Sequence, residues 1–87
     1  MADSDLKKQG GEWFKQLRLK AGLTQVDIMK ACGFDGTTFV SNIENGRSPI
    51  PSGVSPALAR AVGTNPKEFA LNCLKFYRPN LYKMISV

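Results

Sequence analysis

The sequence predicts an all-α fold, a compact bundle of about five short helices. Glycine and proline divide the 87-residue chain into short blocks, and apolar residues recur within several of these blocks at helical spacing. The blocks are too short for strands joined by crossover connections. Because a chain of this length has material for one hydrophobic core, we expect a single domain with short tails.

The first expected helix occupies residues 11–21. Gly10 and Gly11 are expected to mark its start, and Gly22 stands where a left-handed residue commonly ends a helix. Residues 1–10 would then form a flexible basic arm ahead of the domain.

Two short helices are expected next. Thr24 offers its hydroxyl as the N-cap of a helix at residues 25–32, which Gly33 would close. A tight connection that contains Gly36 leads into a third helix at residues 37–45. The sequence therefore predicts two helices of about two turns joined by a short turn that contains glycine.

A loop with two prolines follows the third expected helix. Residues 47–53 hold Pro49 and Pro51 and lack the backbone freedom that regular structure needs. The fourth helix is expected at residues 55–62, with Ser55 as its cap and a proline in its first turn.

The fifth helix has the clearest start. Asn65 is placed to cap it, Pro66 to occupy its first position, and Glu68 stands at capping-box spacing from the cap. Pro79 should end this helix near Tyr77.

The last segment, residues 79–87, is too apolar to remain exposed to water, so it requires a covering surface. One candidate is a second copy of the chain, with the segment forming an extra helix or an exchanged strand of a homodimer. The residues expected at that interface are Tyr77, Leu81, Tyr82, Met84 and Ile85. The alternative is that the segment packs across its own core.

Composition excludes several classes of protein. The chain has no histidine, so it can form neither a histidine-centred catalytic triad nor a histidine-ligated zinc site. Cys32 and Cys73 lack the CxxC spacing, and we interpret both as reduced core thiols. The seven carboxylates are scattered and there is no glycine-rich phosphate loop, so we expect no enzyme, no metal and no cofactor.

The net charge of +5 favours a polyanionic partner. Residues 1–23 carry a net charge of +2 and residues 67–87 carry +3, whereas residues 24–66 are neutral as a group. No stretch approaches the roughly 20 apolar residues of a membrane span, and the N-terminus has no apolar signal region. We therefore expect a soluble cytosolic protein with no membrane partner.

Four blocks of sequence stand in a characteristic order along the chain. They are Gly11-Glu12-Trp13-Phe14-Lys15-Gln16-Leu17-Arg18, then Gly22-Leu23-Thr24-Gln25, then Val40-Ser41-Asn42-Ile43-Glu44-Asn45-Gly46, and finally Leu58-Ala59-Arg60-Ala61-Val62-Gly63 with Pro66-Lys67-Glu68-Phe69. Together they resemble the Cro and phage-repressor (Xre-type) helix-turn-helix family over residues 11 to about 72. The resemblance implies a lambda-repressor-like DNA-binding domain, which we place at residues 11–78.

In that family the third helix enters the major groove of DNA with its N-terminal end first. The short polar side chains that would reach base edges there are Thr37, Thr38, Ser41 and Asn42. Asn42 is the best single candidate, because asparagine can bond an adenine in two places. The alternative is that all four are solvated polar residues on an amphipathic helix.

A second set of residues is expected to contact DNA phosphates. The resemblance assigns this role to Gln25, at the start of the second helix, where the backbone amides and the helix dipole already favour an anion. Arg47 and Ser48 would meet the passing strand from the loop, and Lys7 and Lys8 from the flexible arm. The alternatives are an ordinary first-turn role for Gln25 and solvated surface positions for the cations.

The resemblance gives Arg18 and Glu44 a structural role, as an ion pair that holds the third helix against the first. Removal of one partner from a buried pair of this kind leaves the other charge uncompensated. We therefore expect Glu44 to matter for stability more than for base preference.

The chain departs from the family in its turn, which has one residue more than usual between Gly33 and Val40. Either Asp35 caps the third helix or the turn is simply longer, and the longer turn would tilt the recognition helix and alter binding. Phe39 occupies a position where the family commonly has a small polar residue, so it either lies beneath the turn or contacts a thymine methyl group.

The function implied by the resemblance is that of a sequence-specific regulator of transcription that binds double-stranded DNA. We expect a repressor that acts as a homodimer on a pseudo-palindrome, is associated with the nucleoid in the cytoplasm, and has no small-molecule effector. The alternative is a protein-interaction module, such as an antitoxin or an adaptor, that uses the C-terminal helix and tail as its partner surface.

Overall fold

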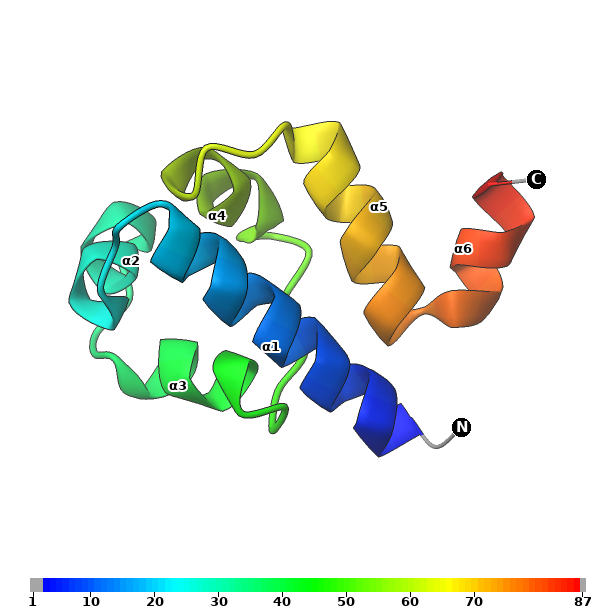
Figure 1. Cartoon of the computed structure of the whole chain (residues 1–87), viewed down its shortest axis with the longest axis horizontal. Coiled ribbons are helices and arrows are strands. Elements are labelled where there is room, and N and C mark those ends of the chain that lie inside the picture. Colours follow the sequence, from blue (N-terminus) through cyan, green and yellow to red (C-terminus); the bar gives the residue numbers. More distant parts are fainter. Residues whose placement is uncertain (1–2, 87) are drawn as a thin grey trace.

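Six α-helices and no strand make up residues 3–86, the part of the chain that the computed structural model describes (Figure 1). The predicted all-α class is confirmed, with one helix more than expected. The helices are α1 (Asp3–Lys20), α2 (Gln25–Cys32), α3 (Thr38–Glu44), α4 (Ser55–Ala61), α5 (Pro66–Tyr77) and α6 (Pro79–Ser86).

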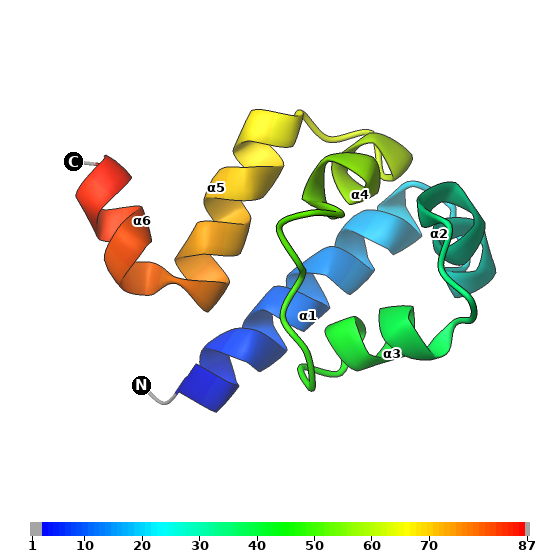
Figure 2. The ribbon, with the colours of Figure 1, turned by 180° about the vertical axis from the view of Figure 1, so that it is seen from behind.

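The helices enclose one apolar core beside α1, the longest of them. Helix α1 packs on α3 and α5, α4 packs on α2 and α5, and α2 packs on α3. Figure 2 shows the chain passing from α3 to α4 across α1. The large side chains at the centre are completely buried, and they are Phe14, Ile28, Val40, Ile43, Leu58 and Phe69. Phe14 meets Phe69 edge to face with ring centroids 6.2 Å apart, so α1 and α5 are joined at the middle of this core.

Helix α2 has the bounds that the sequence predicts, because both of its ends are set by local signals. The Thr24 Oγ1 accepts a hydrogen bond from the Asp27 amide at 3.1 Å, and the Asp27 Oδ2 accepts one from the Thr24 amide at 2.8 Å. This reciprocal capping box satisfies two backbone donors at the start of the helix. Gly33 ends the helix in the left-handed conformation, with φ of 72°.

The turn between α2 and α3 is longer rather than capped by Asp35. Thr37 is the N-cap residue of α3, and no side chain caps this helix. The exposed Asp35 lies in a bend two residues before the cap. The aromatic rings of Phe34 and Phe39 pack together across the turn, with centroids 4.6 Å apart. This pair brackets the extra residue and joins the end of α2 to the first turn of α3.

The predicted capping of α5 is confirmed, and that of α4 is wrong. Asn65 Oδ1 accepts hydrogen bonds from the amides of Lys67 at 2.9 Å and Glu68 at 3.3 Å, which begins α5 as expected. The N-cap position of α4 is instead Val54, with no side-chain cap. Ser55 lies inside the helix, where it is buried and its hydroxyl faces the thiol of Cys73.

The predicted flexible arm at residues 1–10 is also wrong over the residues that the structure describes, because α1 begins at Asp3. Gly10 and Gly11 lie inside the helix and allow other elements to approach it. A Cβ atom on Gly11 would clash with the carbonyl oxygens of Ile43 and Glu44, and one on Gly10 would lie 2.7 Å from the Tyr77 Oη. Glycine disfavours a helix by about 1 kcal/mol per residue, and the packing of α3 and α5 against this surface offsets that cost.

The apolar C-terminal segment forms α6, which begins directly after α5 ends at Tyr77. Of the helices within residues 3–86, α6 packs only on α5. It leaves Leu81, Met84 and Ile85 exposed on one side, and Met84 is the most open of them at 76%. None of the helices in this part of the chain is long and apolar enough to cross a membrane.

Candidate nucleic-acid interface

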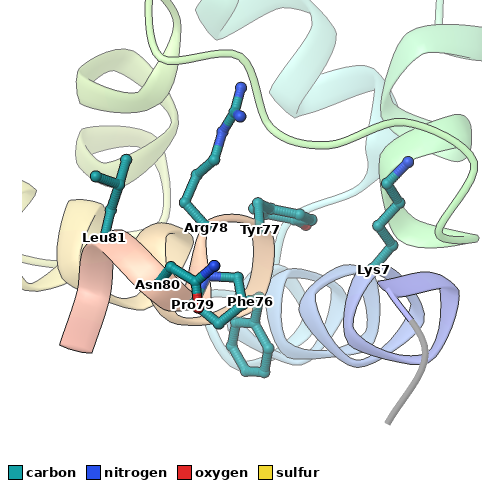
Figure 3. A pocket seen from close by; sticks show the side chains of 7 residues that line it. All are labelled: Lys7, Phe76, Tyr77, Arg78, Pro79, Asn80 and Leu81. Atoms are coloured by element: carbon teal, nitrogen blue, oxygen red, sulfur yellow. The ribbon is translucent and has the colours of Figure 1, made fainter. Parts of the chain in front are cut away.

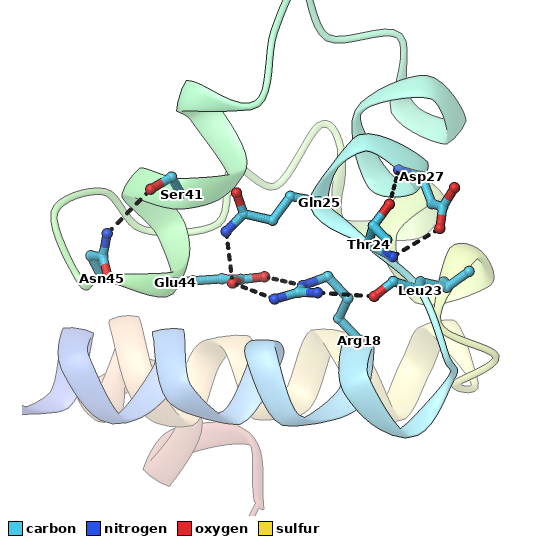
Figure 4. Close-up of polar contacts among 8 residues, drawn as sticks. All are labelled: Arg18, Leu23, Thr24, Gln25, Asp27, Ser41, Glu44 and Asn45. Carbon is cyan, nitrogen blue, oxygen red and sulfur yellow. Dashed lines mark hydrogen bonds and ion pairs between the residues drawn. The ribbon is translucent and has the colours of Figure 1, made fainter.

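A buried ion pair fixes α3 against α1 (Figure 4). Arg18 donates from Nε to Glu44 Oε2 at 2.7 Å and from Nη2 to Glu44 Oε1 at 3.0 Å, and its Nη1 donates to the Leu23 carbonyl at 2.9 Å. Arg18 and Glu44 are each only 7% exposed. The hydrogen bond to Glu44 raises the pKa of Arg18, so the guanidinium remains charged. This pair has the structural position that the sequence resemblance implies.

Gln25 joins the same network from the first turn of α2. Its Nε2 donates to Glu44 Oε1 at 3.1 Å, so one carboxylate connects α1, α2 and α3. The amide nitrogen carries two protons and this bond uses one, which leaves a second donor for a phosphate. The sequence did not indicate the link between Gln25 and Glu44, because it joins residues on two different helices.

The polar residues expected to read bases lie on or beside one face of α3. Thr38, Ser41 and Asn42 follow helical spacing on the side opposite the buried Val40 and Ile43. Thr38 is exposed, and the other two are half-buried. Thr37 stands just before the helix as its N-cap residue.

Asn45 belongs to this face and was missed from the sequence. Its Nδ2 donates to Ser41 Oγ at 3.2 Å, and its side chain is exposed. The signal was present, because Asn45 follows Ser41 by one helical turn. The Ser41 hydroxyl is therefore held in one orientation by a neighbour that can itself meet DNA.

The polar face of α3 formed by Thr38, Ser41, Asn42 and Asn45 is called the reading face below. Phe39 lies beside this face rather than beneath the turn. Phe39 is 37% exposed while its ring packs on that of Phe34. An apolar group with this exposure next to Thr38 is available to a thymine methyl group.

Three of the predicted phosphate contacts gather at the C-terminal end of α3. Arg47 is exposed and Ser48 is half-buried, and both amides donate to the Asn42 carbonyl, at 2.9 and 3.2 Å. Lys8 reaches this place from α1, because a Cβ on Gly46 would lie 2.8 Å from the Lys8 Cγ. The helical form of residues 3–10 thus brings Lys8 against Gly46, the residue before Arg47.

Lys7 does not join them. It lines a hollow together with Tyr77 of α5, Leu81 of α6 and Arg78 between these two helices (Figure 3). The residue one position before Lys8 therefore faces a different part of the molecule.

The residues expected at a dimer interface fall into two groups. Tyr77 and Tyr82 are half-buried within the fold, and the Tyr77 ring packs against the core. The Tyr77 hydroxyl is enclosed and has no hydrogen-bond partner among residues 3–86, and burial raises its pKa. Leu81, Met84 and Ile85 are exposed. Tyr77 is therefore part of the domain's own packing, and the last three form the open apolar surface of α6.

The remaining groups that could ligate a metal are carboxylates and thiols. Across residues 3–86 no three histidine, cysteine or carboxylate groups are placed to hold a metal ion. Cys32 and Cys73 are free thiols. Burial raises the pKa of both, that of Cys73 to about 11, so both thiols are protonated at neutral pH.

Helices α2 and α3, the lengthened turn between them and the neutral polar face of α3 together define a helix-turn-helix DNA-binding domain. A family model described as a helix-turn-helix domain matches residues 11–71. This match covers well over half of the sequence, and the chain belongs to this helix-turn-helix family. No curated protein matches the chain significantly.

Proposed function

We propose that the protein is a sequence-specific regulator of transcription of the Cro and phage-repressor (Xre-type) kind, which represses by occupying its operator. The observation that carries this proposal is the outward face of α3. It presents only short polar side chains and one aromatic ring, while the single charged residue of the helix, Glu44, is turned inward and paired. Such a face can enter a major groove without bringing a carboxylate near the phosphates.

In this mechanism base contacts and phosphate contacts come from different elements. Asn42 reads a base, supported by Thr38 and Ser41, whereas Arg47 and Lys8 neutralise phosphates beside the groove. The positively charged flanks attract the DNA, and the neutral helix discriminates among sequences. This division agrees with the charge distribution of the chain, whose central segment is neutral.

The regulator is proposed to act as a homodimer through α6, because a single α3 offers few base contacts. Leu81, Met84 and Ile85 form an exposed apolar stripe at helical spacing. Pairing of two such stripes would place the α3 helices of two copies on half-sites about one helical turn of DNA apart. The variant Met84→Glu is expected to sediment as a monomer where the parent chain is a dimer.

Selection of bound sequences from random double-stranded DNA, repeated at two salt concentrations, tests this function. We expect an enriched pseudo-palindrome and an affinity that falls steeply with salt. Failure of any sequence to be enriched above the starting pool would exclude the proposal.

A second candidate function, that of a protein-interaction module without catalytic activity, is favoured by a groove between α1, α5 and α6. Salt-insensitive binding of a protein partner, without binding to DNA, would support this alternative. The groove is also compatible with a DNA-binding regulator that recruits a partner.

A further inference from the structure

A groove of about 720 Å³ lies between the loop after α3 and helices α1, α5 and α6. Its floor and walls are largely apolar, and the main contributors are Ile50, Pro51, Ala70, Leu74, Tyr77 and Leu81. A smaller hollow of about 390 Å³ adjoins it around Lys7, Tyr77 and Arg78 (Figure 3). Its size and lining are those of a site that binds apolar side chains.

Prolines make the walls of this groove rigid. The chain has five prolines, and four of them line the groove: Pro49, Pro51, Pro56 and Pro66. The fifth, Pro79, lines the adjoining hollow. Because proline has a fixed φ and no amide proton, these walls lose little freedom on binding and present few donors. The groove is thus preorganised for an apolar occupant.

Among the side chains that the structure describes, the charged residues that line the groove are both cations. They are Lys7 and Arg78, and none of the described carboxylates lines it. Lys75 and Lys83 lie nearby in sequence on α5 and α6, and residues 67–87 carry a net charge of +3. An occupant with carboxylates at its edge would be attracted here, and a basic one would be repelled.

The α6 helix of a second copy does not meet this requirement. Between Pro79 and Ser86 its one charged side chain is Lys83, which would add a further cation beside Lys7 and Arg78. Of the stripe assigned to the dimer, Leu81 also lines the groove, whereas the exposed Met84 and Ile85 do not. A dimer contact through Met84 and Ile85 can therefore form while the groove holds something else.

From this combination we infer that the groove is the docking site for an acidic amphipathic peptide segment of a partner protein. Apolar side chains of the segment fill the space between the proline-rich loop and α5, and its carboxylates pair with Lys7 and Arg78. Since none of the outward residues of α3 lines the groove, the site is separate from the reading face and can be occupied while the protein is on DNA.

A displayed peptide library tests the inference with the full chain as target. Each peptide has about 16 residues, with leucine fixed at helical spacing and the other positions drawn from Asp, Glu, Lys, Gln and Ser. We expect the bound pool to be enriched in Asp and Glu and depleted of Lys. Binding of a selected peptide should weaken as NaCl is raised from about 0.05 M to about 0.5 M.

Charge reversal at matched positions locates the binding site. Arg78→Glu and Ala70→Glu change groove residues that are exposed, and each should weaken a selected acidic peptide about fivefold or more. Lys75→Glu makes the same charge change as Arg78→Glu on an exposed residue of α5 that does not line the groove, and its effect should stay within about twofold. Thermal unfolding of each variant shows that the fold is retained, and DNA affinity of Ala70→Glu should equal that of the parent chain.

Three results would overturn the inference. The first is a bound pool without acidic enrichment. The second is a loss of peptide binding in Lys75→Glu as large as that in Arg78→Glu, which would indicate attraction by net charge alone. The third is dissociation of a dimer by Ala70→Glu, which would make a second copy the occupant. DNA binding is measured separately, so failure of the groove proposal is distinguishable from failure of the regulatory function.

Discussion

Arg18 and Glu44, separated by 26 residues in sequence, form a two-bond contact at 2.7 and 3.0 Å in the interior of the domain. Gln25 adds a third bond to the same carboxylate. The Glu44 carboxylate therefore helps to fix the orientation of α3 relative to α1, and with it the direction of the reading face on the far side of α3.

Glu44→Ala is expected to lower the free energy of unfolding by about 3 kcal/mol, because it leaves the buried Arg18 guanidinium without its partner. Urea unfolding measures this loss. The double variant with Arg18→Ala should recover part of it, since the stranded charge is then removed as well. An unchanged midpoint in Glu44→Ala would contradict the structural role, and so would an altered base preference in a variant of undiminished stability.

Gly11→Ala should destabilise the fold by about 2 kcal/mol or more, although alanine is the better helix former. The added Cβ meets backbone atoms of Ile43 and Glu44, which cannot move aside as a flexible side chain would. Gly53→Ala is the matched control, because nothing lies within 4 Å of a Cβ at that position. That control should be neutral or stabilise by up to about 1 kcal/mol through the unfolded chain. Equal melting temperatures of the two variants would contradict the close approach.

Asn42→Ala and Arg47→Ala should impair DNA binding in different ways. Loss of Asn42 is expected to cost about 1–3 kcal/mol on the preferred sequence and to relax preference at one base pair. Loss of Arg47 should weaken all sequences alike and reduce the salt slope by about one phosphate contact. Titrations of a selected site and of a scrambled site at several salt concentrations separate these effects. Asn80→Ala, an exposed asparagine on α6, should leave both measurements unchanged.

The capping box of α2 should contribute to the acid sensitivity of the protein. Hydrogen bonds from Thr24 lower the pKa of Asp27 below its ordinary value of 3.8. Because the folded pKa is the lower one, the carboxylate contributes stability above the unfolded pKa, and this contribution is lost as the pH falls through the folded pKa. The stability difference between the parent chain and Asp27→Asn should thus be constant above about pH 5 and shrink below pH 3.8. A difference that stays constant down to about pH 2 would refute the assignment.

Cys73 should be slow to alkylate in the folded protein. Burial raises its pKa to about 11, so at pH 8 its thiolate fraction is far below that of the same thiol in the unfolded chain. We expect its reaction with iodoacetamide to accelerate at least about tenfold in denaturing urea, as followed by mass spectrometry of the Cys32→Ser variant. Equal rates in buffer and in urea would show that the thiol is open to solvent.

The parts of the fold that the sequence predicted correctly are those set by neighbouring residues. The bounds of α2 follow from Thr24, whose side chain caps the start of the helix, and from Gly33, which ends it. The start of α5 follows in the same way from the side chain of Asn65. The errors arose where contacts distant in sequence decide the structure. Gly10 and Gly11 have low helix propensity, but α3 and the end of α5 pack directly against them. Serine is a common N-cap residue, but Ser55 is buried against α5, beside Cys73.

The candidate site divides in the same way. The face shared by Thr38, Ser41 and Asn42 follows from helical spacing alone, and so was predictable. The bond from Gln25 to Glu44 was not, since it depends on how α2 lies across α3. The groove is lined by residues between Lys7 and Leu81, and only the folded chain brings them together.

The first turn of α1 and the last turn of α6 lie at the same end of the molecule, opposite α2 (Figure 1). An affinity tag, a fluorophore or a fused effector domain attached at either end would accordingly project away from the paired helices α2 and α3. The two ends are not equivalent as attachment points, however, because α6 carries the open apolar stripe and one wall of the groove. A chimaera joined before α1 leaves the apolar stripe of α6 open but adds bulk near Lys7 and Lys8, whereas one joined after α6 adds bulk beside the apolar stripe and the groove.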